Sequence, residues 1–244
     1  MGNYFSSPRP STKAVHMKTR RNSSISGRIG KMILTRKEVM DADPHPITFE
    51  KIILKLERLH SVLKYVKQLF YSHADSSGHL YMKDLPKIMQ TISSTMTVDE
   101  IYDLFDYIDV THSKSIGLKE FLVSLCVGYV LDIIPAFHDA LSVNQLQLEF
   151  DSSSFSEKLF HRNKDIKEVL ELLVSTFILF DPQGGGCINR KVVDKIIKEK
   201  QKKENLDLMF SAERWDEMGW DNNGNIDFAE FVFHFSSWVD LFED

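Results

Sequence analysis

Apolar residues recur at steps of three and four along most of the chain, and short polar segments interrupt this pattern four times. The longest periodic run starts near Ile47 and continues to Phe70. Further runs cover residues 101–108, 121–127 and 166–180. Such spacing places the apolar side chains on one face of an α-helix. The pattern therefore predicts an all-α fold built from amphipathic helices.

The four polar interruptions are centred near residues 78, 114, 186 and 224. Within each set of two the centres lie 36 and 38 residues apart, whereas 72 residues separate the two sets. We therefore expect four helix–loop–helix units in two lobes, residues 46–130 and 165–244, joined by a linker over 131–164. Thr97 and Glu100 match a capping box, which predicts that a helix begins there.

Each interruption can be aligned to a twelve-residue calcium loop. In such a loop oxygens come from positions 1, 3, 5, 7 and 9, a glycine at position 6 makes the turn, and a bidentate Glu closes the shell at position 12. All four loops then have an aliphatic residue at position 8, which would pair two loops through a short strand: Leu80, Ile116, Ile188 and Ile226. A single loop also fits a chance Asx turn, but four in one register predict the EF-hand fold.

The fourth loop, residues 219–230, matches this frame best. Gly224 stands at position 6. Positions 3, 5, 7, 9 and 12 hold Asp221, Asn223, Asn225, Asp227 and Glu230. Gly219 takes position 1, where a carboxylate normally begins the shell, so water would have to replace that ligand. We expect a Ca²⁺ site here with reduced charge and affinity.

The second loop, residues 109–120, keeps a carboxylate at each end. Positions 1, 3, 5, 7 and 12 hold Asp109, Thr111, Ser113, Ser115 and Glu120. Lys114 replaces the turn glycine, which costs backbone strain because a positive φ is disfavoured for a residue with a Cβ. We expect weak Ca²⁺ binding in this loop, with Mg²⁺ as a competitor.

The first and third loops, residues 73–84 and 181–192, lack the bidentate glutamate. Asp84 and Val192 stand at position 12. The shorter Asp reaches a calcium ion poorly, and Val offers no oxygen. We therefore expect both loops to be structural.

Four segments carry a resemblance to a known family: residues 52–55, 100–105, 120–126 and 217–224. Over residues 47–238 the sequence resembles the plant-type calmodulin-like EF-hand proteins, particularly a subgroup with glycine at position 2 and a basic leader. The resemblance implies calcium binding in the cytosol and regulation of other proteins. In that family Asp normally occupies the position of Gly219, and the third loop normally ends in Glu where Val192 stands.

The net charge of −5 conceals an uneven distribution. Residues 1–37 carry nine basic and no acidic side chains, which leaves a balance of −14 in the remainder. Residues 1–45 are rich in Ser, Arg, Lys and Pro and show no helical period. We therefore expect a disordered basic tail over this segment.

The tail also carries two modification motifs. Residues 1–6 fit the N-myristoylation pattern with Gly2 as acceptor, which predicts a lipoprotein. One acyl chain binds a membrane only marginally, and the basic residues would add attraction to an anionic membrane surface. Ser23 follows Arg20-Arg21-Asn22 and resembles a phosphorylation target of basophilic kinases, whose phosphate would weaken that attraction. The alternative is a solvated basic tail without a membrane role.

Other classes of protein find no support in the sequence. No nucleophile–base pair, phosphate loop or zinc-spaced cluster is present, so we expect no enzyme. No aromatic or groove-reading pattern accompanies the basic residues, which argues against nucleic-acid binding. No apolar run is long enough to span a membrane, and the two cysteines fit reduced thiols in the cytosol.

Two functions stay open. The first is a calmodulin-like Ca²⁺ sensor in signalling, which grips an amphipathic helix of a target protein. The second is a calcium-independent adaptor that uses the four units as a fixed scaffold. In either case we expect a cytoplasmic protein, free or peripheral at the inner face of a membrane.

Overall fold

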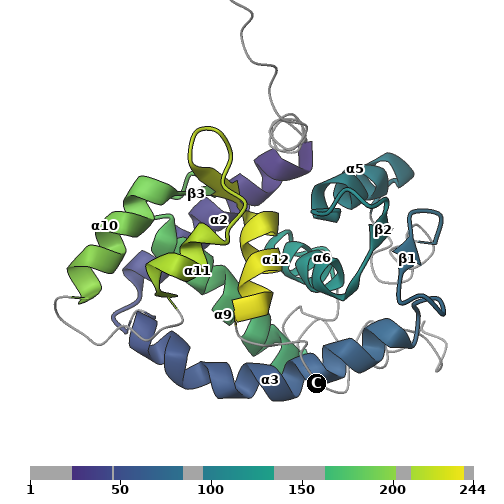
Figure 1. The fold of residues 1–244 in the computed structure, drawn as a ribbon, viewed down its shortest axis with the longest axis horizontal. Coiled ribbons are helices and arrows are strands. Elements are labelled where there is room, and N and C mark those ends of the chain that lie inside the picture. The colour runs from purple at the N-terminus through teal and green to yellow at the C-terminus, as the bar shows by residue number, and fades with distance from the viewer. Residues whose placement is uncertain (1–23, 46, 85–95, 135–162, 202–209, 239–244) are drawn as a thin grey trace, which may run out of the picture.

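The computed structural model describes residues 24–45, 47–84, 96–134, 163–201 and 210–238. Most of these residues lie in helices, as the hydrophobic pattern predicts (Figure 1). The helices are α2 (Ser24–Ala42), α3 (Phe49–Tyr71), α5 (Val98–Ile108), α6 (Leu118–Val130), α9 (Asn163–Phe180), α10 (Arg190–Gln201), α11 (Ala212–Asp216) and α12 (Phe228–Trp238). The strands are β1 (Leu80–Tyr81), β2 (Ser115–Ile116), β3 (Cys187–Asn189) and β4 (Asn225–Asp227).

Local side-chain hydrogen bonds explain where several helices begin. The predicted capping box before α5 is confirmed: the Glu100 N–H donates to Thr97 Oγ1 at 3.2 Å, and the Thr97 N–H donates to Glu100 Oε2 at 2.9 Å. Thr48 caps α3 and Ser211 caps α11 in the same way, each accepting from a backbone N–H three residues on. These caps satisfy N–H groups that have no partner within the first helical turn.

The four loops pair through two short antiparallel sheets, β1 with β2 and β3 with β4. The register places Leu80 opposite Ile116 and Ile188 opposite Ile226. These are the residues at position 8 of each loop, so the predicted pairing of loop one with loop two and of loop three with loop four is confirmed. All four side chains are buried.

The two pairs of loops share one hydrophobic core. Helix α6 packs against α12 and α9, and α3 packs against α9. Phe177 of α9 lies between Phe228 and Phe231 of α12, with ring centroids 5.2 and 5.5 Å apart. Helix α6 is buried from Glu120 to Val130, as is typical of a helix that is apolar on all sides. The sequence predicts the pairs of loops but not this packing of one pair against the other.

Helix α2 corrects the prediction of a disordered tail over residues 1–45. Residues Ser24–Ala42 are helical, and Ile25, Ile29 and Ile33 are fully buried at four-residue spacing. Burial of each such side chain stabilises the fold by roughly 1.5–3 kcal/mol, which outweighs the poor helix propensity of the segment. Figure 1 shows α2 close to α5 and to the loop that carries β3.

Several predictions fall outside the described residues. These are the acylation of Gly2, the phosphorylation of Ser23 and most of the linker proposed over 131–164, of which residues 135–162 are not described. The beginning of that linker, Leu131, Ile133 and Ile134, is buried. Among the helices described, none has both the length and the apolar character needed to cross a bilayer.

Candidate metal centre

Loop two connects α5 to α6 and holds both of its carboxylates inside the fold. Asp109 and Glu120 are 6% and 3% exposed. Asp109 Oδ1 accepts the Ser113 N–H at 3.0 Å, and Oδ2 accepts the Lys114 N–H at 2.9 Å. The hydroxyls of Ser113 and Ser115 lie 2.9 Å apart. The first half of the loop therefore wraps around the Asp109 carboxylate.

Glu120 closes the loop from its other end. Its Oε1 accepts the hydroxyl of Thr111 at 2.6 Å and the Thr111 N–H at 3.1 Å. Its Oε2 accepts the Gly117 N–H at 2.8 Å, which also caps the start of α6. Hydrogen bonds thus join the five residues predicted for this loop into two groups. Asp109 is grouped with Ser113 and Ser115, and Thr111 is grouped with Glu120.

The turn of loop two is strained at the residue where the sequence predicts it. Lys114 has a φ of 60°, in the left-handed region that glycine normally occupies. His112 has a φ of 56° in the same loop. A residue with a Cβ loses roughly 1–2 kcal/mol in this conformation. The loop keeps its shape nonetheless, because the Lys114 N–H is held by Asp109 and the Ser115–Ile116 strand by β1.

Loop four connects α11 to α12 and turns at Gly224, whose φ of 70° costs a glycine nothing. Asp221 Oδ1 accepts the N–H groups of Asn223 at 2.9 Å and Asn225 at 2.7 Å. Asp227 is 2% exposed and caps α12, since its Oδ1 accepts the Glu230 N–H at 2.9 Å.

The closing glutamate of loop four, Glu230, is 2% exposed. Gly219, at position 1, brings no side-chain oxygen to the loop. Trp220 lies inside the loop, and its Nε1 donates to the Trp215 carbonyl at 2.7 Å. The two indole rings are 6.0 Å apart, so both report on the geometry of this loop.

Comparison with known proteins gives relatives for most of the chain. The chain is 27% identical to the probable calcium-binding protein CML21 of Arabidopsis thaliana over 198 residues, which cover 81% of this chain and 78% of that protein. It is 27% identical to the probable calcium-binding protein CML22 of the same plant over 196 residues, or 80% and 79% of the two chains. The chain is a relative of the plant calmodulin-like proteins.

A shorter similarity leads to a troponin C. Over 89 residues the chain is 32% identical to troponin C, isoallergen Bla g 6.0101, of Blattella germanica, which covers 35% of this chain and 56% of that protein. No protein-family model matches the chain. The resemblance to plant calmodulin-like proteins that the sequence segments indicate is confirmed by CML21 and CML22, which align with 81% and 80% of this chain.

The other two loops of this calmodulin-like chain use their aspartates for backbone turns. In loop one, Asp75 Oδ1 accepts the Ser77 and His79 N–H groups at 2.8 and 3.0 Å; the latter bond is the main cause that lowers the Asp75 pKa. In loop three, Asp181 Oδ2 accepts the Gly186 N–H at 2.7 Å. Burial nevertheless raises the pKa of Asp181, with the glycine N–H groups opposing the shift. Neither loop ends in a glutamate, so both remain predicted structural loops.

The donors of loop two fit a hard cation. In the part of the chain that the structure describes, no three His, Cys, Asp or Glu side chains gather as a metal cluster. An EF-hand loop does not need one, because hydroxyl, amide and backbone oxygens complete its shell. The ligand positions of loop two offer oxygens only, and two of these positions hold buried carboxyl groups.

One residue of the site is missing from the sequence prediction. Asn189 Nδ2 donates to Asn225 Oδ1 at 2.7 Å, so the Asn225 side chain is turned toward the neighbouring strand. The β3–β4 register places these residues opposite each other. The sequence could have indicated this contact. When loops three and four are paired antiparallel at position 8, Asn189 at position 9 of loop three faces Asn225 at position 7 of loop four. Only the backbone carbonyl of Asn225 is thus available as the ligand of that position.

Proposed function

We propose that the protein is a calcium-binding regulator with four EF-hand units in two pairs, of which loops two and four bind Ca²⁺. The observation that carries this proposal is the geometry of loop two, in which Asp109 and Glu120 are buried at opposite ends of a loop whose ligand positions offer only oxygens. The calcium-binding relatives named above support the same function.

Each predicted ligand has a definite role in this proposal. In loop two, Glu120 would contribute two oxygens and Asp109 one, with Thr111, Ser113 and the Ser115 carbonyl between them. In loop four the ligands would be Asp221, Asn223, the Asn225 carbonyl, Asp227 through water, and Glu230. The ion supplies positive charge to buried carboxylates. Magnesium would compete, though it fits a flexible loop of this kind less well.

Regulation would follow from the position of Glu120 and Glu230 in the first turn of α6 and α12. A glutamate that moves toward the ion pulls its helix with it, and in sensor EF-hands this exposes a groove for a partner helix. We expect a target protein with an amphipathic helix as partner, in the cytoplasm or at the inner face of a membrane. We expect neither catalysis nor nucleic-acid binding.

A specific observation favours a second function, the calcium-independent adaptor. Both oxygens of Asp109 and both of Glu120 accept hydrogen bonds from within loop two. The loop is therefore held in shape by its own donors, and a bound ion would have to replace some of these bonds. Gly219 weakens loop four as a site in addition.

Calcium titration separates the two functions. Calorimetry and the emission of Trp215 and Trp220 should respond to Ca²⁺ more strongly than to Mg²⁺. Glu120→Gln and Glu230→Gln should each remove one binding event, because the neutral amide cannot provide a bidentate carboxylate. Asp106→Asn and Glu217→Gln remove exposed carboxylates just outside the loops and should change neither signal. The absence of heat and of any emission change in the unmodified protein would select the adaptor.

The tail is tested separately. Acylation of Gly2 predicts an intact mass increased by one myristoyl group in protein from its native cell. The acylated chain should bind vesicles that contain anionic lipid more strongly than neutral ones, and phosphate on Ser23 should weaken this binding. An unmodified or acetylated N-terminus would reject the lipoprotein.

A further inference from the structure

Helix α2 has the pattern of a bound amphipathic helix. Its buried residues, Ile25, Ile29 and Ile33, are 0%, 1% and 0% exposed and lie on one stripe. The opposite face is exposed at Gly27, Lys31 and Glu38. Aliphatic anchors four residues apart, with a solvated opposite face, are typical of helices that bind in a groove of another protein.

The surface beneath α2 belongs to both pairs of loops. Helix α2 contacts α5, α6 and α9. It also lies against loop three so closely that a Cβ on Gly186 would come within 3.0 Å of Gly30 Cα, and one on Gly184 within 2.7 Å of Leu34 Cδ1. The surface that α2 covers is therefore formed by three helices, with loop three at one side.

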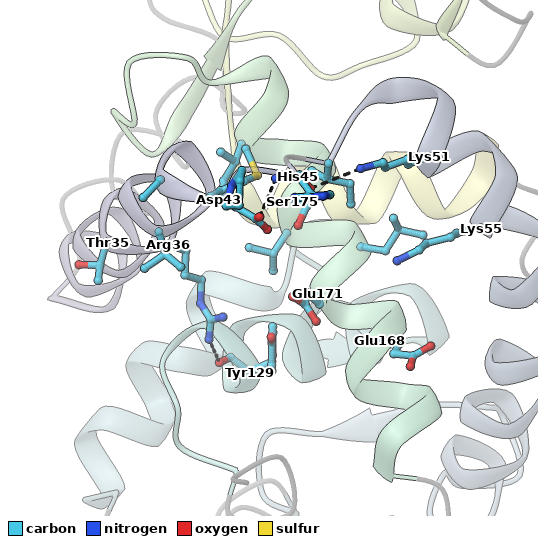
Figure 2. Close-up of a pocket in the computed structure, with 18 residues that line it drawn as sticks. Thr35, Arg36, Asp43, His45, Lys51, Lys55, Tyr129, Glu168, Glu171 and Ser175 are labelled. Carbon is cyan, nitrogen blue, oxygen red and sulfur yellow. Dashed lines mark hydrogen bonds between the residues drawn. The ribbon is translucent and has the colours of Figure 1, made fainter.

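Two arginines of α2 hold the helices that flank loop two. Arg28 Nη1 contacts Glu100 Oε1 at 3.0 Å, in the first turn of α5. Arg36 Nη2 donates to the Tyr129 carbonyl at 2.9 Å, in the last turn of α6, and its guanidinium lies 4.3 Å from the centre of the Tyr129 ring (Figure 2). Both contacts are at the helix ends remote from loop two. A change in the angle between α5 and α6 would therefore alter at least one of them.

Helix α2 is weak apart from these contacts. Gly27 and Gly30 lie within it, and a Cβ on either would meet nothing within 4 Å. There is thus space for a larger residue at both positions, and each glycine weakens the helix relative to alanine. The helix has no acidic residue in its first turn and no basic residue in its last. It ends beside a cavity of about 820 Å³ between α3 and α9, which leaves its last turn loosely packed (Figure 2).

We propose that α2 is an intramolecular occupant of the partner-binding groove, and that a partner helix binds by displacing it. The proposal deepens the proposed regulatory function and rests on it for the role of calcium. The partner would carry aliphatic residues at i, i+4 and i+8 and a basic residue at i+3 to pair with Glu100. Helix α2 itself has this pattern, from Ile25 through Arg28 to Ile33.

The test uses the full chain and a fluorescein-labelled peptide of residues 24–42 as probe. Ile29→Asp places a charge in the groove and should release α2, so the peptide should bind this variant at least tenfold more tightly than the unmodified protein. Gly27→Ala strengthens α2 and should weaken peptide binding about fivefold. Val39→Asp makes the same kind of change as Ile29→Asp at an exposed position and should have no effect. A peptide carrying Ile29→Asp should not bind any of these proteins.

Hydrogen exchange distinguishes the release of α2 from unfolding of the whole protein. In the unmodified protein, α2 amides should exchange at least tenfold faster than those of α6. In each variant, the peptide should bind only where the amides of α6 and α12 keep the protection that they have in the unmodified protein. Equal protection of α2 and α6, or equal peptide affinity for Ile29→Asp and the unmodified chain, would overturn the proposal.

The same titrations, run with excess Ca²⁺ and with a chelator, keep the two proposals apart. Peptide binding to Ile29→Asp without any calorimetric response to Ca²⁺ supports the groove and rejects the calcium regulator. A calcium response without peptide binding to Ile29→Asp does the reverse. If both proposals hold, calcium binding and the release of α2 favour the same conformation. Release of α2 should then also raise the calcium affinity of loop two, because two events that are coupled through one conformational change affect each other reciprocally.

Discussion

Loops 109–120 and 219–230 each keep a different half of a calcium loop. Loop two has a buried carboxylate at both ends, Asp109 and Glu120, but turns at Lys114 with a φ of 60°. Loop four turns at Gly224, where a φ of 70° is free of strain, but begins with Gly219. The difference teaches that ligand charge and backbone geometry are separate requirements, since each loop makes its turn and pairs its strand without one of them.

The partner loops explain how an incomplete loop keeps its shape. Leu80 of loop one pairs with Ile116 of loop two, and Ile188 of loop three pairs with Ile226 of loop four. Loops one and three lack a closing glutamate, yet each contributes a strand and a buried aliphatic side chain. Their role is therefore to fix the geometry of the loop opposite.

Restoring the first carboxylate of loop four should give the largest effect. Gly219→Asp adds a charged ligand at position 1, and we expect calcium affinity of this loop to rise about tenfold or more, which corresponds to about 1.4 kcal/mol. Calorimetry in a Glu120→Gln background isolates loop four. Gly219→Asn, which adds a neutral oxygen, should give a smaller gain. An unchanged affinity in both variants would mean that missing charge does not limit this loop.

Relieving the turn of loop two should give the next largest effect. Lys114→Gly removes the Cβ from a residue with positive φ and should raise the free energy of unfolding by about 1 kcal/mol, because the backbone N–H bond to Asp109 remains. Urea unfolding in the presence of a chelator measures it. Lys114→Ala removes the charge but keeps the strain and should not stabilise. Equal stability of the glycine and alanine variants would contradict the role given to φ.

Breaking the side-chain bond between loops three and four should have a smaller effect. Asn189→Ala removes the donor to Asn225 Oδ1 and should lower the free energy of unfolding by about 0.5–1.5 kcal/mol. Trp220 emission should shift as well, since loop four loses a contact with its partner strand. Gln183→Ala, at an exposed position of loop three, is the control. A destabilisation of the same size in both variants would show that the effect does not come from this hydrogen bond.

Sequence patterns anticipate the local features of this fold and miss the distant ones. The helical class, the capping box at Thr97 and the strand register follow from spacing along the chain. The contact of α6 with α12 does not, because it depends on which faces meet after the loops have paired. Helix α2 has a readable stripe at Ile25, Ile29 and Ile33, but its glycines and the basic, Ser-rich composition of residues 1–45 obscured it.

The candidate ligands show the same division. Side-chain spacing is enough to select the residues of loop two that the structure brings together. It is not enough to show that Asn225 turns toward Asn189, which requires the register of two strands 36 residues apart. Whether the selected residues bind calcium stays a prediction, since the affinity depends on the balance between an ion and the internal hydrogen bonds of the loop.

Two carboxylates near the loops should give opposite pH dependences of stability, the smallest effect expected. Burial raises the pKa of Asp181, so the folded state takes up its proton first as pH falls. Relative to Asp181→Asn, the unmodified protein should therefore gain stability as pH falls through this raised pKa toward 3.8. The Thr97 N–H bond, with help from Arg28, lowers the pKa of Glu100. Relative to Glu100→Gln, stability should be lost as pH falls from 4.5 through that lowered pKa.

Urea unfolding of the three proteins between roughly pH 3 and 7 measures both slopes, in a chelator so that calcium binding does not contribute. The two effects bear on different parts of the comparison: Asp181 belongs to the loop that shapes loop four, and Glu100 to the helix that leads into loop two. Because Glu100 also contacts Arg28 of α2, its protonation should increase amide exchange in α2. Slopes of the same sign for the two variants would contradict the opposite environments that the structure gives these side chains.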